Sequence, residues 1–228
     1  MSNHDKSIIS RRSRPAKDPL SKDIIVQTAF KLMMDEGISG LSMRKIAKAL
    51  DTGASSLYVY VKNLQELRAY VLDYRLKDVK IPNNKNASWK EGIFEVLHSY
   101  YTVLYQSPGM AELALTTVPV GSHSSAIIEY ILKQLDLGSI RSTSAAWGAD
   151  LLLLYTTSVA YEQTSRNQKG QDSTLISTYL HSLEGSQYPM ISSMKKEIFS
   201  GESERFQWGI EAVLQGISVL KDGKKPLN

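Results

Sequence analysis

Two groups of residues near the N-terminus have side chains suited to contacting a nucleic acid. The first group is Arg44 and Lys45, which follow Ser42 in the first turn of an expected short helix. Cationic side chains there oppose the partial positive charge of the helix N-terminus, and a docked phosphate would explain them. The alternative is a pair of solvated surface residues with a small electrostatic penalty.

The second group begins the next expected helix, with Ala54, Ser55 and Ser56. Small side chains let a helix end approach base edges closely, and the two hydroxyls can donate or accept hydrogen bonds. Tyr58 is expected to point away from the apolar face of this helix, toward DNA. Tyr60 fits a phosphate contact and core packing equally well.

This second helix has no Arg, Lys, Asn or Gln before Lys62, and those residue types make the strongest base contacts. Arg44 is therefore the candidate for a guanine contact. Shape readout and the basic N-terminal residues are expected to supply the remaining specificity.

A longer supporting helix followed by two short helices is expected to position these side chains. Ser21 and Ser42 are expected N-caps, Gly37 and Gly40 end the first helix, and Asp51-Thr52-Gly53 separates the second from the third. The apolar faces are Ile25, Ala29, Leu32 and Met33; Ile46, Ala47 and Leu50; and Leu57 and Val61, in a third helix spanning Ala54–Val61. Two short helices joined by a glycine-containing turn are typical of the helix-turn-helix motif.

The charge distribution also distinguishes this region. Residues 1–68 carry 12 Lys and Arg against seven Asp and Glu, although the whole chain has a net charge of only +4. A basic head on a near-neutral body indicates a polyanionic partner for the head, with a solvated basic tail as the alternative. We expect a flexible basic arm at 1–19, a helix-turn-helix domain at 20–68 and a helical regulatory domain at 69–228.

The rest of the chain predicts an all-α body. A fourth helix is expected to start near Leu64, and helical patterns resume after a linker at 83–87. The expected body helices cover 88–106, 109–118, 122–136, 141–166, 188–199 and 202–222, with a break at Asn167–Ser173. No segment alternates convincingly with period two.

Several classes of protein are disfavoured. The 228 residues contain no cysteine, no long apolar run typical of a membrane helix and no secretory signal, so a soluble cytoplasmic protein is expected. No phosphate loop, nucleophile elbow or metal-binding helix motif is found, which argues against an enzyme and predicts no cofactor. A helical adaptor that has lost DNA affinity remains as the alternative.

The stretch GLSMRKIAKALDTGASSLYVYVKNLQEL closely resembles the DNA-binding head of the tetracycline-repressor (TetR) family. The resemblance covers residues 22–70. It implies that Arg44, Ala54, Ser55, Ser56, Tyr58 and Tyr60 occupy positions used on operator DNA and that Lys62 begins the exit motif. Leu64 departs from the family pattern, which usually has a phosphate-binding lysine there.

The C-terminal segment from Glu204 to Ile217 resembles the last helix of the tetracycline-repressor subgroup. Gly209 and Gly216 are seven residues apart and therefore share a stripe that a second helix can approach closely, although packing within one chain would explain them too. The resemblance implies a homodimer joined through this helix and the helix at 141–166. The expected interface residues are Phe206, Gly209, Ile210, Val213 and Gly216.

The resemblance also implies an inducer cavity in the body. Clustered aromatic and methionine side chains are more often core than pocket. The residues expected to line the cavity are Tyr100, Tyr101, Leu104, Leu113, Thr117, Trp147, Leu151 and Tyr155. Asp150 interrupts an apolar run and could face a cationic ligand, a partner's charge or solvent.

Tetracycline is an unlikely ligand, because the family's repressor holds it with magnesium through a histidine that residues 110–115 lack. His98 and His123 have no second ligand at metal spacing, so no metal site is expected. The sequence thus predicts a regulator that binds a palindromic operator in double-stranded DNA as a homodimer and is released by a small-molecule inducer, with no membrane association.

Overall fold

A computed structural model describes residues 19–83, 88–169, 173–183, 185–198 and 200–220. All regular structure in these ranges is helical, which confirms the expected all-α class. The basic arm expected at 1–19 lies almost wholly outside the described residues. The helices follow the order α1 (Lys22–Glu36), the 3-10 turn η2 (Gly37–Gly40), α2 (Met43–Ala49), α3 (Ala54–Leu57), α4 (Leu64–Leu76), α5 (Trp89–Tyr105), α6 (Met110–Thr116), α7 (Ser122–Leu137), α8 (Ser142–Lys169), α9 (Ser173–Ser182), α10 (Pro189–Ser193) and α11 (Glu202–Val219).

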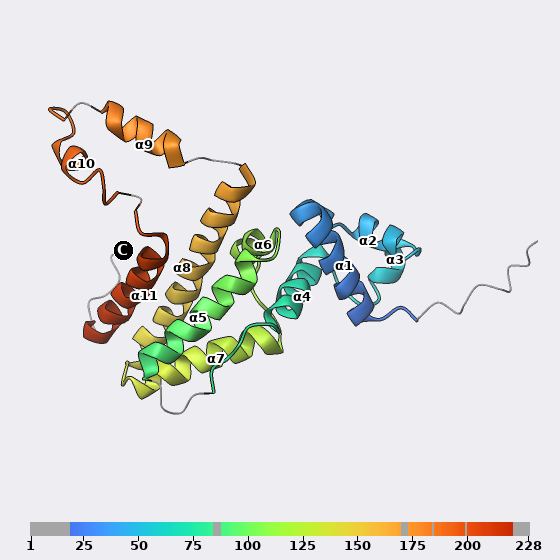
Figure 1. Cartoon of the computed structure of the whole chain (residues 1–228). Helices are drawn as coiled ribbons and strands as arrows, with labels where there is room; N and C mark the ends of the chain where they lie inside the picture. The colour runs from blue at the N-terminus through green and yellow to red at the C-terminus, as the bar shows by residue number, and fades with distance from the viewer. Residues whose placement is uncertain (1–18, 84–87, 170–172, 184, 199, 221–228) are drawn as a thin grey trace, which may run out of the picture.

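Helices α1, α2 and α3 form a small head at one end of the molecule (Figure 1). Both expected N-caps are present: Ser21 Oγ accepts a hydrogen bond from the Ile24 amide at 3.2 Å, and Ser42 Oγ accepts one from the Lys45 amide at 3.3 Å. The expected apolar residues of the first two helices pack inward, and Leu57 is fully buried in the same core.

The third helix is shorter than the sequence predicts. It ends at Leu57 rather than Val61. Residues 58–60 form turns, with the Tyr60 amide bonded to the Leu57 carbonyl at 3.0 Å, and Asn63 is extended where it caps α4. The apolar side of the turn is as expected, because Leu57 and Val61 are both buried.

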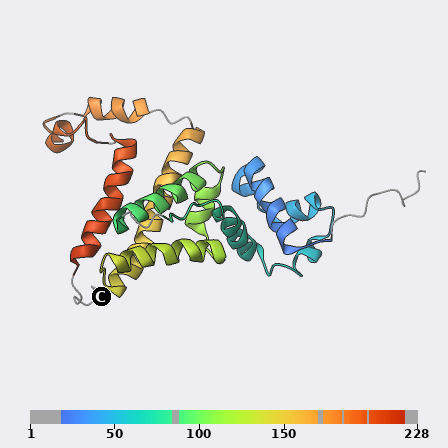
Figure 2. The same cartoon turned by 60° about the horizontal axis from the view of Figure 1, so that its bottom comes forward.

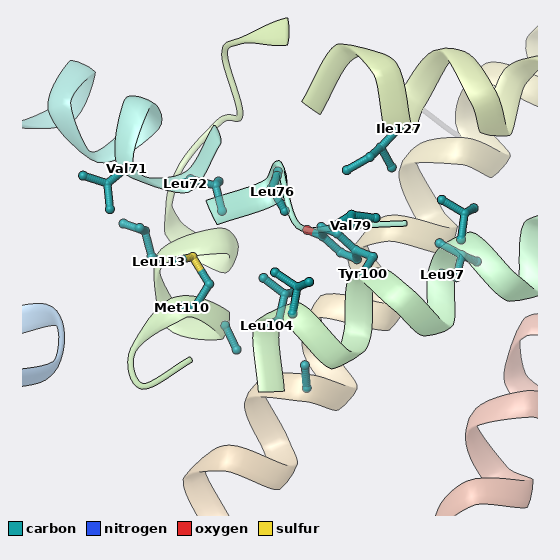
Figure 3. Packing of buried hydrophobic residues seen from close by; sticks show 14 of the residues in the cluster. Val71, Leu72, Leu76, Val79, Leu97, Tyr100, Leu104, Met110, Leu113 and Ile127 are labelled. Atoms are coloured by element: carbon teal, nitrogen blue, oxygen red, sulfur yellow. The ribbon is translucent and has the colours of Figure 1, made fainter. Parts of the chain in front are cut away.

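Helix α4 joins the head to the body (Figures 1 and 2). It packs against α1 on one side and against α6 and α7 on the other. Figure 3 shows Val71, Leu72 and Leu76 of α4 in the core beside α5, α6 and α7, together with Val79, Leu97, Tyr100, Leu104, Met110, Leu113 and Ile127. A movement of α4 must therefore disturb packing in both parts of the chain.

The body is organised around the long helix α8, which packs against α5, α6, α7 and α11. Glycines permit the close approach of α8 and α11. A Cβ atom at Gly209 of α11 would lie 2.1 Å from the hydroxyl oxygen of Tyr155 on α8, and one at Gly148 would lie 2.9 Å from Ile217. The close neighbour of Gly209 is thus in its own chain.

The segment after α8 differs from the sequence prediction. Helix α8 continues to Lys169, into the expected break, and α9 occupies a segment for which no helix was predicted. Helix α10 ends at Ser193 and not at 199. Helices α9 and α10 project beyond the body (Figures 1 and 2).

Candidate DNA interface and ligand cavity

The N-terminal turn of α2 presents one unpaired and one paired cation. The side chain of Arg44 is exposed and makes no hydrogen bond or ion pair within the described part of the chain. Lys45 Nζ instead lies 2.5 Å from Glu36 Oε2 and donates to the Ser39 carbonyl at 2.9 Å. Arg44 is therefore more available to an external anion than Lys45.

The surface of α3 and its following turn is open to solvent. Ala54 and Ser55 are exposed, Ser56 is half-buried, and the side chains of Tyr58 and Tyr60 are 53% and 38% exposed. These exposures place the two tyrosines outside the core. The structure thus brings the expected contact residues onto one outward-facing segment.

Val59 was missed by the sequence reasoning. It is 79% exposed between the two tyrosines, in the turns that follow Leu57. An exposed apolar side chain on this surface can contact a thymine methyl group. A helix continued through Val61 would also place Val59 opposite Leu57 and Val61, so the helical spacing was the available signal.

The start of α4 is held by a compact set of hydrogen bonds around Glu66. Its carboxylate accepts from the Lys62 amide at 2.5 Å and from the Tyr70 hydroxyl at 2.8 Å, while its own amide donates to Asn63 Oδ1. The hydrogen bond from the backbone amide of Lys62 is the main cause that lowers the pKa of Glu66. The Lys62 side chain itself stays exposed.

Leu64 occupies the position where the family usually has a lysine. It is half-buried and packs against the hydrophobic core. This side chain cannot neutralise a phosphate, so a phosphate contact near the start of α4 has to come from a neighbour such as Lys62.

A cavity of about 640 Å³ lies in the body beside α8. This volume is within the range of small-molecule sites. The wall combines residues from five helices and the segment after α6: Gln65, Tyr100, Ala114, Leu115, Thr116, Thr117, Val118, Pro119, Ile128, Leu132, Ala146, Ala149, Asp150, Leu153, Leu154 and Thr157. Most of these side chains are apolar, as in many ligand pockets.

Two of the expected lining residues, Tyr100 and Thr117, contribute to this wall. The Tyr100 hydroxyl lies 3.1 Å from Thr157 Oγ1, and burial raises the pKa of Tyr100. The hydroxyl of Thr117 is buried and has no hydrogen-bond partner within the described residues. Such a group is uncommon in native structures, where ligand or water usually satisfies it.

The other six expected residues lie elsewhere. Leu104 and Leu113 are fully buried in the core, while Trp147 and Leu151 are exposed on another face of α8. Tyr101 and Tyr155 pack around Phe206, with ring centroids 5.1 and 6.0 Å from its own. Their apolar types do not distinguish a cavity from a core or an outer face.

A second cavity of about 670 Å³ lies between the end of α4 and α5. Its wall is more charged and includes Arg75, Asp78, Glu95 and His98. Arg75 is already bonded to Asp78 and to the hydroxyl of Ser107. The first cavity offers the more apolar surface and is therefore the better candidate ligand site.

A buried carboxylate connects α4 to the start of α7. Asp73 accepts hydrogen bonds from the amide and hydroxyl of Ser124 at 2.8 and 2.9 Å, and its other oxygen lies 3.0 Å from His123 Nδ1. Burial alone raises the pKa of Asp73, but these hydrogen bonds outweigh it and leave the pKa below its ordinary value. A Cβ atom at Gly121 would lie 2.1 Å from the Asp73 carboxyl carbon, so only glycine permits this approach.

The residues expected at a dimer interface divide into two groups. Phe206, Gly209 and Ile210 are buried against the same chain, with Phe206 in the aromatic cluster. Val213 and Gly216 are half-buried, and a Cβ atom at Gly216 would meet nothing within 4 Å. The exposed large apolar side chains of α8 and α11 are Trp147, Leu151, Leu154 and Tyr161 of α8 and Trp208 and Val219 of α11, and Leu154 also lines the first cavity; we call this set the α8–α11 stripe.

Neither a membrane-spanning helix nor a cluster of metal ligands is found among the described residues. No helix in the described ranges combines the length and apolar character needed to cross a membrane. The same residues contain no group of three or more His, Cys, Asp or Glu side chains that could hold a metal ion.

A helix-turn-helix head, one connecting helix and an all-helical body with a ligand-sized cavity define a DNA-binding regulator. The chain belongs to the TetR family of transcriptional regulators. Residues 25–71 match the family model for bacterial regulatory proteins of the tetR family, and residues 81–220 match the model for the tetracyclin repressor-like C-terminal domain. The family consists of transcriptional regulators and not of enzymes.

Individual relatives agree with this assignment. The HTH-type transcriptional repressor DrrR1 of Streptomyces coeruleorubidus is 25% identical over 224 residues, which cover 92% of this chain and 82% of DrrR1. The structure of the Streptomyces coelicolor TetR family protein ActR in complex with (S)-DNPA is 33% identical, with a TM-score of 0.80 over 88% of this chain and 98% of ActR. ActR in complex with actinorhodin gives a TM-score of 0.79 at 33% identity, over 88% of this chain and 96% of ActR.

Proposed function

We propose that this protein is a repressor that binds a palindromic operator as a homodimer in the cytoplasm and releases it when a small molecule enters the body cavity. The observation that carries the proposal is the position of Gln65. This residue lies in the first turn of α4, directly after the DNA-facing segment, and also lines the cavity. A ligand there can therefore contact the helix that carries the head.

The DNA-binding half of the proposal rests on the exposed surface of α2 and α3. Arg44 supplies a cation for a guanine or a phosphate, and the α3 segment supplies small, hydroxyl and apolar groups for base edges. Lys45 and Lys62 are proposed to contact phosphates, the former after leaving Glu36.

The dimer is proposed to form through the α8–α11 stripe. Trp147 and Trp208 are 74% and 71% exposed, although large aromatic side chains are usually well covered. A second copy packed along both helices would bury this stripe and place two heads on one duplex. A two-fold dimer reads two half-sites, which is the reason for expecting a palindrome.

The release step is proposed to act through α4. The cavity wall includes 117–119, and the chain then reaches Gly121, His123 and Ser124, which meet Asp73 of α4. A ligand that fits the cavity better with α4 displaced would shift the protein toward a form with altered head spacing. The two ActR complexes support a small organic ligand as the effector.

Selection of bound sequences from a random duplex pool at about 150 mM salt tests the proposal, because phosphate-anchored binding persists but weakens as salt rises. An enriched palindrome is the expected result, and its neighbouring genes then supply candidate ligands for release assays. If ligand-stripped protein enriches no sequence from the pool, DNA binding would be contradicted. The alternative of a helical adaptor would then be favoured.

A further inference from the structure

Helix α8 presents one carboxylate to the ligand cavity. Ala146, Asp150, Leu153 and Thr157 follow one another at helical spacing, and all four line the wall. Asp150 is exposed in the single subunit and lies at the mouth of the cavity, one helical turn before Leu154. Its carboxylate has no hydrogen bond or ion pair to any residue that the structure describes.

The rest of the wall does not neutralise Asp150. It is the only charged residue among the described residues that line the cavity. Gln65 and three threonines supply the polar groups, while the Tyr100 hydroxyl is bonded to Thr157. Apolar walls strengthen the field of an unpaired carboxylate, which attracts cations and disfavours anions.

We infer that the cavity selects an apolar ligand carrying one cationic group, such as a protonated amine, with Asp150 as the counter-ion. The inference rests on the proposed use of this cavity and adds the charge of the ligand. The apolar wall holds the body of the ligand, and Asp150 holds its charged end at the mouth. A neutral ligand of the same shape binds more weakly, and an anionic one more weakly still.

Two fluorescent probes that differ at one end test this selection. Dansylcadaverine carries a primary amine that is protonated at pH 7, and N-hexyl dansylamide has a methyl group in its place. Titration of the full chain without DNA should give a dissociation constant about fivefold lower for the amine, as expected for a solvent-accessible ion pair. The Asp150→Asn variant should remove this preference, and the dissociation constant of the amine should change more than that of the neutral probe.

Matched variants locate the effect. Asp136 is an exposed acid on α7 outside the cavity, so Asp136→Asn should retain the full preference. Ala146 lines the cavity, and Ala146→Trp should weaken binding of both probes by filling it. Sedimentation of Asp150→Asn should show an unchanged mass, because the carboxylate serves the ligand and not a partner subunit.

The inference is overturned if neither probe binds, if the wild type does not prefer the amine, or if Asp150→Asn retains the preference. Dissociation of the Asp150→Asn protein into subunits would assign the carboxylate to the interface instead. These results do not depend on the operator. A protein that prefers the amine but binds no duplex would refute the proposed function and leave the charge selection intact.

Discussion

Arg44 and Tyr58 are the residues with the clearest DNA-facing roles. Both are exposed and make no side-chain hydrogen bond or ion pair in the ranges that the structure describes. We expect Arg44→Ala to weaken operator binding about ten- to a hundredfold, the loss typical of a good base contact. Tyr58→Ala should have a smaller effect in the same direction.

The matched control is Lys133→Ala, which removes a positive charge from α7 in the body. Its operator affinity should equal that of the wild type in a fluorescence-anisotropy titration, and all three variants should sediment as dimers. Normal binding by Arg44→Ala would remove that residue from the interface.

A second prediction concerns the effect of Gly209 on the stability of the fold. An added methyl group would overlap the hydroxyl of Tyr155, 2.1 Å away, and this hydroxyl already donates to the Arg205 carbonyl. We expect Gly209→Ala to lower the free energy of unfolding by about 1–3 kcal/mol, as overpacking usually does. Chemical denaturation measures this loss. Unchanged stability would mean that α11 shifts without penalty.

The packing partner of Gly209 could not be predicted from the sequence. The spacing of Gly209 and Gly216 predicts a helix face that another helix approaches, and Gly209 has such a neighbour, whereas a Cβ atom at Gly216 would meet nothing within 4 Å. It does not say whether that helix belongs to the same chain, and Gly209 packs on Tyr155 of its own α8. Likewise, residue type could not separate cavity-lining Tyr100 from Tyr101, which packs against Phe206.

Among the elements, the contact between α4 and α7 carries the proposed coupling. Asp73 is nearly buried and holds the first turn of α7 through Ser124 and His123. We expect Asp73→Asn to destabilise the protein by about 1–3 kcal/mol at pH 7, because a charged acceptor is lost from a buried site. It should also reduce the response of operator binding to ligand.

The stability effect has a definite pH dependence. The folded-state pKa of Asp73 is below the unfolded value of 3.8, so its stabilisation is fully present above that value and disappears as the pH falls through the folded pKa. The stability difference between wild type and Asp73→Asn should therefore shrink on acidification below about pH 4. A difference that is constant down to pH 2 would exclude the carboxylate's charge as the cause.

Much of the element pattern was predictable because local chemistry determines it. Ser21 and Ser42 cap their helices as their types predict, and the inward faces of α1 and α2 follow helical spacing. The end of α3 was not predictable from Leu57 and Val61, because both a helix and a turn can bury that pair. Helix α9, which projects from the body, was not predicted.

At the scale of the whole molecule, the α8–α11 stripe predicts the oligomeric state. We expect Trp147→Glu to shift the protein toward monomers, because a charge would be buried in the interface. Operator affinity should fall as the dimer is lost. Analytical ultracentrifugation measures the shift. Leu137→Glu is the matched control, because Leu137 is also largely exposed but lies at the end of α7. This variant should remain a dimer.

Gly216 offers a finer test of the same surface. An alanine there meets nothing within 4 Å in its own chain, so it should not lower the stability of the subunit. If the last helix of a second copy lies against it, as proposed, Gly216→Ala should still weaken the dimer. A dimer of unchanged affinity would place the contact elsewhere along the stripe.

The head is proposed to bind DNA largely through phosphate contacts, and the salt dependence of duplex binding tests this proposal. For a dimer that neutralises about six phosphates, affinity should fall roughly a thousandfold between 50 and 200 mM salt, linearly on logarithmic axes. The slope should become shallower for Arg44→Ala if that residue contacts a phosphate, and stay unchanged if it contacts a base. Absence of duplex binding by ligand-stripped protein even at the lowest salt would contradict the account.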